Sequence, residues 1–409
     1  MGLIVFLKRF CYFLIRVYNL IQIKNDKSIF IVPHHNCKSD KYDIINYRSD
    51  NALCLFNYMI REKTFVDYLI TIVVDNVSAI ETYREYIRNI NPQIKVEFVP
   101  RNKTSLNYIN CFCRSKFIFS TTEYELFPYK VSTQCISCLG YFTPFKNDFI
   151  YKSEKEFLGI LKRNNAAYDY YFTTSPFASR IIASDTGVYY SKFKHLGFSR
   201  NDIFFSKELK VKASELINND YSCFDKIIVY TPTFRDYELN VADGKRGLFG
   251  FNDKNIESLI RILEKYNAVL IAKLHPFQNK SVVEAFNSPN IRLYDSAQSN
   301  YSLYDLLSVA DLLLTDYTST VFDFLFADKP VIFNFYDKVE YEQTRGFAVE
   351  PIEAICPGHI VNNIEALSNM IDYIFCGNDD FKAKRIEVSK FINYYQDGLS
   401  SKRICDFLF

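Results

Sequence analysis

Residues 311–337, DLLLTDYTSTVFDFLFADKPVIFNFYD, decide which fold this chain of 409 residues adopts. The apolar run Leu312–Leu314 predicts a buried strand. A polar turn with three small hydroxyl side chains, Thr318–Thr320, follows it, and the pattern then predicts a helix over Val321–Ala327. A second apolar strand is predicted over Val331–Phe335. The stretch therefore has the order strand, polar turn, helix, strand.

Two roles for the turn are consistent with this order. Backbone N–H groups and small hydroxyls at the positive end of a helix form a cradle for a phosphate group, such as that of a phosphorylated donor. Ser and Thr are also the usual residues that cap a helix when no ligand is involved. The turn alone does not decide between a phosphate site and a simple cap.

The same alternation of strands and helix-length segments runs through both halves of the chain. The predicted strands are Ile29–Val32, Tyr68–Val74, Val96–Val99, Phe117–Ser120 and Tyr170–Thr173 in the first half, and Ile227–Tyr230, Ala268–Ala272, Leu312–Leu314 and Val331–Phe335 in the second. Strands separated by helices pair in parallel, and 409 residues are enough for two domains. We predict an α/β chain of GT-B-like architecture, with two Rossmann-like domains at residues 26–205 and 206–409 whose parallel sheets face a central cleft.

Composition excludes some partners. The net charge is only +2 and no strongly basic region is present, so nucleic acid is not an expected partner. The chain has eleven cysteines and no secretory signal, which indicates a reducing cytoplasm. Cys111, Cys113, Cys135 and Cys138 could supply four zinc thiolates, but their spacing fits no standard zinc motif. We interpret them as buried small hydrophobes and predict no metal site.

Residues 1–25 are a possible membrane-contact helix, of which Met1–Ile23 is apolar but carries Lys8, Arg9 and Arg16. They lack both the cleavage site of a signal peptide and the uncharged length of a spanning helix. A basic amphipathic helix at the inner face of the plasma membrane fits this pattern, and so does a first helix that packs on its own domain. The first interpretation predicts a cytoplasmic, peripheral membrane protein.

Polar clusters follow three predicted strands of the second half. These clusters are Thr231–Asp236, Lys273–Pro276 and Thr318–Thr320. Because the carboxyl ends of parallel strands meet at one edge of a sheet, we expect the three clusters to lie close together. A Lys, an Arg, a His and several hydroxyls at one edge can bind a diphosphate and neutralise the charge that develops on a leaving phosphate.

These clusters belong to an ordered set of motifs. The set is LGFSRND at 196–202, TPTFRD at 231–236, KLHP at 273–276 and TDYTSTVFD at 315–323, followed by Tyr341 with Arg345-Gly346-Phe347 and by Pro357-Gly358. The set resembles the CDP-glycerol glycerophosphotransferase family, which comprises teichoic acid primases and polymerases with their capsule and O-antigen relatives. The resemblance runs from about Val131 to Val361.

The resemblance implies a GT-B transferase that moves a polyol phosphate from CDP-glycerol or CDP-ribitol to a hydroxyl of a glycan or lipid-linked acceptor and releases CMP. It implies no tightly bound cofactor, and although Mg²⁺ could accompany the diphosphate, no carboxylate pair is dedicated to it. His275 would lie nearest the transferred phosphate. The residues implied to bind the donor are Arg200, Pro232, Thr233, Arg235, Lys273, Thr318, Ser319, Thr320, Asp323 and Arg345.

One segment departs from the family pattern. Members carry H-G-T-P-L-K, whose His is taken to deprotonate the acceptor, and the matching stretch here is Gly140–Lys146. Thr143 and Lys146 are retained on this acceptor side, but Tyr141 stands in the position of the His. A tyrosine with an ordinary pKa of about 10 is a poor base at neutral pH.

Three interpretations of this departure remain open. His34 or His35, which follow the first predicted strand, could act as the base. Alternatively His275 performs all proton transfer, because phosphoryl transfer depends mainly on positioning. The third interpretation is that the activity has been lost or changed.

Two alternatives to a polyol-phosphate transferase follow from the same pattern. One is a GT-B glycosyltransferase that uses a nucleotide sugar, and the other is a non-catalytic nucleotide-binding relative. The sequence does not identify the polyol, the acceptor or the number of transfers.

Overall fold

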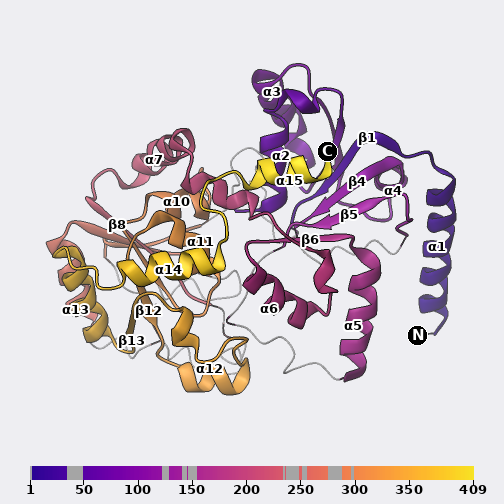
Figure 1. Ribbon diagram of the computed structural model, residues 1–409. Coiled ribbons are helices and arrows are strands. Elements are labelled where there is room, and N and C mark those ends of the chain that lie inside the picture. The colour runs from indigo at the N-terminus through magenta and orange to yellow at the C-terminus, as the bar shows by residue number, and fades with distance from the viewer. Residues whose placement is uncertain are drawn as a thin grey trace. The chain divides into compact units, whose positions relative to one another are not determined.

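The computed structural model describes residues 2–34, 49–121, 129–140, 145, 154–233, 235, 248–250, 256–274, 288–295 and 299–409, with the backbone alone for residues 2–8, 154, 155, 157 and 160. The chain divides into two compact units (Figure 1). Unit 1 comprises Met1–Tyr141, Ser153–Arg200 and Leu399–Phe409, and unit 2 comprises Phe142–Lys152 and Asn201–Gly398.

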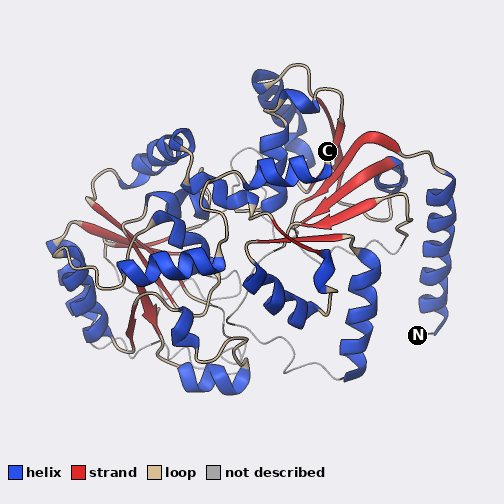
Figure 2. Cartoon of the chain, in the orientation of Figure 1, coloured by secondary structure: helices blue, strands red, loops and turns tan. Residues whose placement is uncertain are grey.

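Unit 1 is built on a seven-stranded sheet in which every strand pairs in parallel with its neighbours. The strand order is β3-β2-β1-β4-β5-β6-β7, with helices around the sheet (Figure 2). The strands are β1 Asn25–Val32, β2 Leu69–Val74, β3 Lys95–Pro100, β4 Ser115–Ser120, β5 Cys135–Cys138, β6 Tyr170–Thr173 and β7 Phe193–His195. The helical elements are α1 Gly2–Ile21, α2 Asn51–Met59, η1 Lys63–Phe65, η2 Val77–Ala79, α3 Ile80–Ile90, α4 Leu106–Arg114, α5 Glu154–Ala167, α6 Pro176–Thr186, η3 Tyr190–Lys192 and α15 Ser400–Leu408. The 3₁₀ helix η4 Ser199–Phe204 begins in unit 1 and continues into unit 2.

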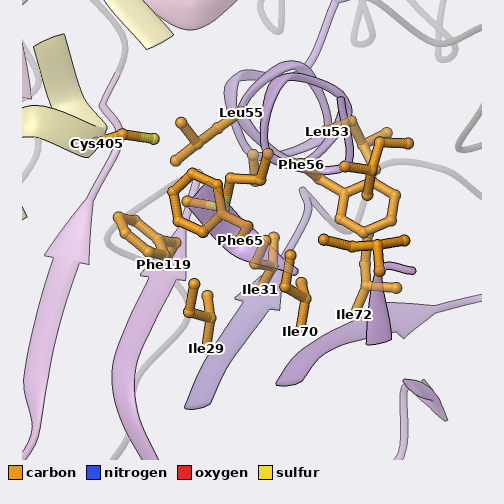
Figure 3. Close-up of a cluster of buried hydrophobic side chains, with 14 of the residues drawn as sticks. Ile29, Ile31, Leu53, Leu55, Phe56, Phe65, Ile70, Ile72, Phe119 and Cys405 are labelled. Carbon is orange, nitrogen blue, oxygen red and sulfur yellow. The ribbon is translucent and has the colours of Figure 1, made fainter. Parts of the chain in front are cut away.

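Both faces of this sheet are covered, which explains why β1 ends in a continuous apolar run. Ile29 and Ile31 point to a core formed with Leu53, Phe56 and other side chains of α2 (Figure 3). Phe30 points to the opposite face, where its ring lies 5.2 Å from Tyr108 of α4. Successive side chains of a strand alternate between faces, so α2 covers Ile29 and Ile31 while α4 covers Phe30.

The last helix completes unit 1. Cys405 of α15 joins the α2 core (Figure 3). The ring centroid of Phe409 lies 5.2 Å from that of Phe65. The division predicted from the sequence assigned 206–409 to one domain, whereas residues 399–409 pack with the first unit. The apolar side chains of this short helix gave no signal of which domain they would cover.

Unit 2 contains a six-stranded sheet, again with parallel pairing throughout. Its order is β10-β9-β8-β11-β12-β13. The strands are β8 Lys226–Thr231, β9 Ala268–Ala272, β10 Ile291–Leu293, β11 Leu312–Thr315, β12 Val331–Asn334 and β13 His359–Val361. The helical elements are α7 Lys207–Tyr221, α8 Ile256–Lys265, α10 Leu303–Val309, α11 Thr320–Phe324, η7 Leu325–Ala327, α12 Lys338–Thr344, η8 Ile352–Ile355, α13 Ile364–Phe375 and α14 Lys382–Ile392.

The core of unit 2 is built in the same way, from strand side chains that alternate between the two faces of the sheet. Leu312 and Leu314 of β11 pack with Leu259 and Leu263 of α8 and with Leu367 of α13. The two parallel sheets with their helices confirm the predicted α/β fold class, and all nine predicted strands are present within one to four residues of their predicted ends. The short strands β5, β7, β10 and β13 were not predicted, because three or four residues give little periodicity.

The four cysteines considered as zinc ligands lie on α4 and β5. Cys111, Cys113 and Cys138 are buried parts of the core. Burial raises the pKa of the Cys111, Cys113 and Cys135 thiols to about 11, so they remain protonated at neutral pH. Across the residues that the structure describes, no group of three or more His, Cys, Asp or Glu side chains could hold a metal ion.

The glycine of the Pro357-Gly358 segment has a packing role. A Cβ atom on Gly358 would lie 2.2 Å from the backbone oxygen of Val331, where β12 begins.

Gly358→Ala should therefore lower the free energy of unfolding by about 1–3 kcal/mol, measured by urea denaturation. The control is Gly159→Ala in α5, where no atom lies within 4 Å of the added Cβ. That change should raise the free energy of unfolding by about 0.5–1 kcal/mol. Equal effects of the two substitutions would contradict this account of Gly358.

Candidate functional site

The polar clusters of unit 2 follow neighbouring strands, as predicted. Strands β9, β8, β11 and β12 are consecutive in the sheet, and their carboxyl ends lead into Lys273, Pro232-Thr233, Asp316 and Asp337 respectively. Direct hydrogen bonds join the first residues of these loops. The backbone N–H of Thr233 donates to both carboxylate oxygens of Asp316, at 2.8 and 2.9 Å.

Arg235 lies at the centre of this edge of the sheet and is 2% exposed. Its Nε and Nη2 donate to the two oxygens of Asp337 at 2.7 and 3.0 Å. Its Nη1 donates to Asp316 at 2.8 Å and to the backbone oxygen of Thr233 at 2.6 Å. A fork of donors facing two carboxylates is the arrangement for which arginine is suited.

Aromatic rings enclose the Arg235 guanidinium. The rings of Tyr317, Tyr336 and Tyr341 have their centroids 5.0, 5.4 and 5.2 Å from its central carbon. Burial alone would lower the pKa of Arg235, but Asp316 and Asp337 raise it well above its ordinary value. The sequence predicted that Arg235 binds the donor. Since its nitrogens all donate to protein groups, we infer that it holds the strand-end loops in place.

Ser319 does not act as an ordinary helix cap. It occupies the N-cap position of α11 with helical backbone angles and makes no side-chain hydrogen bond to the helix. By contrast, Ser105, Ser175, Ser206 and Ser302 each cap their helices by accepting from a backbone N–H. The helix itself is α11 followed by the 3₁₀ turn η7, together close to the predicted Val321–Ala327. Ser319 therefore does not cap α11 through its side chain, whereas the Thr318 hydroxyl in the same turn accepts from the Thr320 N–H at 3.5 Å.

Two further groups at these strand ends, the partly buried ammonium of Lys273 and the buried hydroxyl of Thr233, have no protein partner among the described residues. Burial lowers the pKa of Lys273, and no carboxylate in the described part of the chain forms an ion pair with its ammonium. The hydroxyl of Thr233 is buried and likewise has no hydrogen-bond partner there. A partly buried cation and a buried hydroxyl of this kind are stabilised by an anion that accepts their hydrogen bonds.

Asp323 has partners within its own unit. Its Oδ1 accepts from the Asn201 amide at 2.8 Å, and its Oδ2 accepts from the Tyr304 hydroxyl. The carboxylate thus ties the N-D end of the LGFSRND motif to α11. Beside it, Phe145 of the Gly140–Lys146 segment packs on Phe322, with ring centroids 5.1 Å apart.

In unit 1, two predicted residues are anchored to the start of α2. The backbone N–H of His34 donates to Asp50 at 3.0 Å, and that of Arg200 donates to the Asn51 side chain at 3.1 Å. Gly140 accepts from the same Asn51 at 2.9 Å. The remaining predicted residues on this side and the central histidine of the KLHP motif lie outside the described residues: His35, Tyr141, Thr143, Lys146 and His275.

Several residues that organise these loops were not predicted. Asp50 carried a recognisable signal, because an Asp directly before an apolar helical run is a typical N-cap. No sequence signal marked Asp337 or Asn51, because their roles depend on strands that lie far apart in the sequence.

Comparison with known proteins identifies the family. The model of the CDP-glycerol:poly(glycerophosphate) glycerophosphotransferase family matches residues 22–409. The chain belongs to this family. The match includes all four ordered motifs and the Gly140–Lys146 segment.

The curated relatives act in teichoic acid synthesis. A teichoic acid glycerol-phosphate primase of Bacillus subtilis (strain 168) is 32% identical over 244 residues, which is 59% of this chain and 58% of the primase. The teichoic acid ribitol-phosphate polymerase TarK of Staphylococcus aureus (strain NCTC 8325 / PS 47) is 28% identical over 60% of this chain and 46% of its own length. The chain thus spans about half the length of the curated relatives it matches.

A solved structure supports the fold. A single-residue variant of the wall teichoic acid polymerase TagF has a TM-score of 0.73 with 20% identity, covering 96% of this chain and 92% of that chain. A TagF variant soaked with CDPG has a TM-score of 0.70, also with 20% identity, covering 99% and 93%. These likenesses establish the GT-B-like architecture of the chain.

The Arg235 contacts predict a large effect on stability. Arg235→Met would leave the buried carboxylates of Asp316 and Asp337 without their cation, so the free energy of unfolding should fall by about 3–5 kcal/mol in urea denaturation. Arg235→Lys should also destabilise, because an ammonium cannot donate to both carboxylates in the same planar arrangement.

The matched control breaks an exposed ion pair. Lys402 and Asp406 pair on the surface of α15 with about half of each side chain exposed or more. Lys402→Met should leave the urea midpoint unchanged. The account of Arg235 is wrong if Arg235→Met and Lys402→Met have the same midpoint.

Proposed function

We propose that this chain transfers a polyol phosphate, glycerol or ribitol phosphate, from its CDP ester to a hydroxyl of a glycan or lipid-linked acceptor. Family membership and the teichoic acid enzymes among its relatives support this function. The observation that carries the proposal is the meeting of the TPTFRD and TDYTSTVFD motifs, with Lys273, at neighbouring strand ends.

The donor diphosphate would bind at this edge of the sheet in unit 2. Lys273 would supply positive charge, and the hydroxyls of Thr233 and Ser319 would donate to phosphate oxygens. Thr318 and Thr320, whose hydroxyl oxygens lie 3.2 Å apart, would border the same site. Pro232, Arg345, Asp323 and the Arg200 side chain remain donor-binding candidates on the basis of the motifs that contain them.

The reaction itself requires one bond to form and one to break. The acceptor oxygen attacks the phosphorus that carries the polyol, and the bond from that phosphorus to the bridging oxygen of CMP breaks. CMP leaves with the electron pair, and Lys273 would offset the charge that develops on it. The proton of the acceptor hydroxyl passes to a base, for which His275, His34 and His35 are the candidates and Tyr141 the weakest.

We also propose that α1 binds the surface of an anionic membrane. No helix within the described residues is long and apolar enough to span a bilayer. Asn19, on one side of α1, is buried by hydrogen bonds to Tyr129 and Gln134. The opposite side exposes an apolar stripe, flanked by the exposed residues Arg9 and Arg16; the stripe consists of Phe10, Phe13, Leu14, Val17 and Ile21. Such a stripe with basic flanks is typical of helices that lie in the membrane interface.

Binding of CDP-glycerol, measured by calorimetry, tests the donor site. Lys273→Met should weaken binding at least about tenfold, because a charge-assisted hydrogen bond to phosphate is lost. Since burial lowers the pKa of Lys273, the wild-type affinity should fall as the pH rises, starting below the ordinary lysine pKa of about 10.4. Lys273→Arg should remove this decline, because guanidinium stays protonated.

Two serines provide a matched pair for the same measurement. Ser319→Ala should weaken CDP-glycerol binding about fivefold with little effect on stability. Ser206→Ala removes the cap of α7, so it should lower the free energy of unfolding by about 1 kcal/mol and leave binding unchanged.

The proposed function fails if UDP-N-acetylglucosamine binds and CDP-glycerol does not, which would favour a glycosyltransferase. Binding without CMP release would favour a non-catalytic relative.

Vesicle flotation tests the membrane proposal. The full chain should float with vesicles that contain phosphatidylglycerol, and Phe13→Glu with Val17→Glu should abolish this because charge is placed in the apolar stripe. Val211→Glu is the control, because Val211 is 58% exposed but lies on α7, outside the apolar stripe of α1. If Val211→Glu reduces flotation as much as the α1 double variant, α1 is not the membrane contact.

A further inference from the structure

The start of α2 joins four separate loops of unit 1, and nothing in the family motifs singles it out. We propose that Asp50 and Asn51 are positioning residues that fix the acceptor side of the site. The proposal rests on the proposed function for its catalytic consequence. Both side chains are buried, with 3% and 0% exposure.

Asp50 binds more than its own helix. Its Oδ1 accepts from the backbone N–H of Leu53 at 2.9 Å, which caps α2. Its Oδ2 accepts from the backbone N–H of His34 at 3.0 Å and from the hydroxyl of Thr121 at 2.8 Å. His34 follows β1 and Thr121 follows β4, which is the neighbouring strand. One carboxylate thus fixes two strand-end loops in addition to a helix.

Asn51 fixes two more loops through its side-chain amide. Its Nδ2 donates to the backbone oxygen of Gly140 at 2.9 Å, and its Oδ1 accepts from the backbone N–H of Arg200 at 3.1 Å. Gly140 follows β5, the next strand of the sheet after β4, and begins the segment in which Tyr141 replaces the family histidine. The two ends of the amide therefore hold an acceptor-side loop and a donor-side motif.

The position of Gly140 is constrained from a second direction. Its φ is +69°, and a Cβ atom there would lie 2.5 Å from the backbone oxygen of Phe172. Only glycine fits this conformation without strain, so the loop approaches β6 closely while Asn51 holds its carbonyl.

Capping of α2 alone would not require both Asp50 and Asn51. Among the described residues, four other helices are capped by a serine whose side chain accepts from one N–H group of its own helix. A buried carboxylate and a buried amide are costly unless their hydrogen bonds are made, and here Asp50 accepts three hydrogen bonds and Asn51 makes two to other loops. Buried polar groups with several partners specify one arrangement of the loops they join.

Asn51→Asp separates the two functions of the amide. An aspartate keeps an oxygen for the Arg200 N–H but cannot donate to Gly140, whose carbonyl it would repel. The KM for a synthetic fluorescent tri(glycerol phosphate) acceptor should rise about tenfold, while the Kd for CDP-glycerol should change less than about twofold. Asn164→Asp is the matched control, because within the described residues the buried Asn164 amide of unit 1 donates to the backbone oxygen of Thr186 alone, at 3.3 Å. Asn164→Asp should lower the melting temperature and leave unchanged both the KM for the acceptor and the Kd for CDP-glycerol.

A second readout does not depend on activity. Asp50→Ser keeps a cap for α2 but removes the acceptor for His34, so hydrogen exchange of the His34 amide should become at least about tenfold faster than in the wild type. The Arg200 amide should be unaffected by this change. Unchanged exchange at His34, or an equal loss of donor and acceptor affinity in Asn51→Asp, would overturn the proposal. If the wild-type chain releases no CMP but the exchange result holds, the proposed function fails and the positioning role of Asp50 stands.

Discussion

The buried guanidinium of Arg235 is the contact on which the strand ends of unit 2 depend. Two buried carboxylates next to each other repel, and each loses its hydration on folding. Their burial is possible here because each accepts several hydrogen bonds. Asp316 accepts from Arg235 and from the Thr233 N–H, and Asp337 accepts from Arg235 and from the Tyr317 hydroxyl at 3.2 Å. The cation and its two partners come from the loops after β8, β11 and β12, so one interaction sets the spacing of three loops.

This interaction also determines which groups are left to bind a ligand. The network uses the charged side chains Arg235, Asp316 and Asp337 entirely for the protein, and it contains one more negative than positive charge. An anionic diphosphate at the same edge then depends on cations outside the network, and Lys273 is such a cation. The hydroxyls of Thr233 and Ser319 are held on rigid loops without being used for capping. Groups that are fixed before the ligand arrives lose little conformational entropy when it binds.

The sequence predicted the parts of this arrangement that are local. Apolar runs located the long strands, and the ordered motifs located the loops after β8, β9 and β11. It did not predict the partner of Arg235, since Asp337 is 102 residues away and follows a different strand. The motif suggested that Arg235 binds phosphate, and only the contacts show that its donors face carboxylates. In the same way, α15 gave no sequence signal that it packs with unit 1, because an amphipathic helix does not encode which surface it covers.

The two units fix their loops by different means. Unit 2 uses an ionic network, whereas unit 1 uses one carboxylate and one amide at the start of α2, which together hold the loops after β1, β4 and β5. This difference bears on the replacement of the family histidine by Tyr141. A general base contributes about 10²–10⁴-fold to a rate, while correct orientation of two reactants contributes far more. Phosphoryl transfer in particular depends on orientation and on charge stabilisation at the leaving group. Under the proposed function, the hydrogen bond that fixes Gly140 to Asn51 and the partly buried cation of Lys273 would supply the larger contributions to the rate, even with a weaker base at position 141.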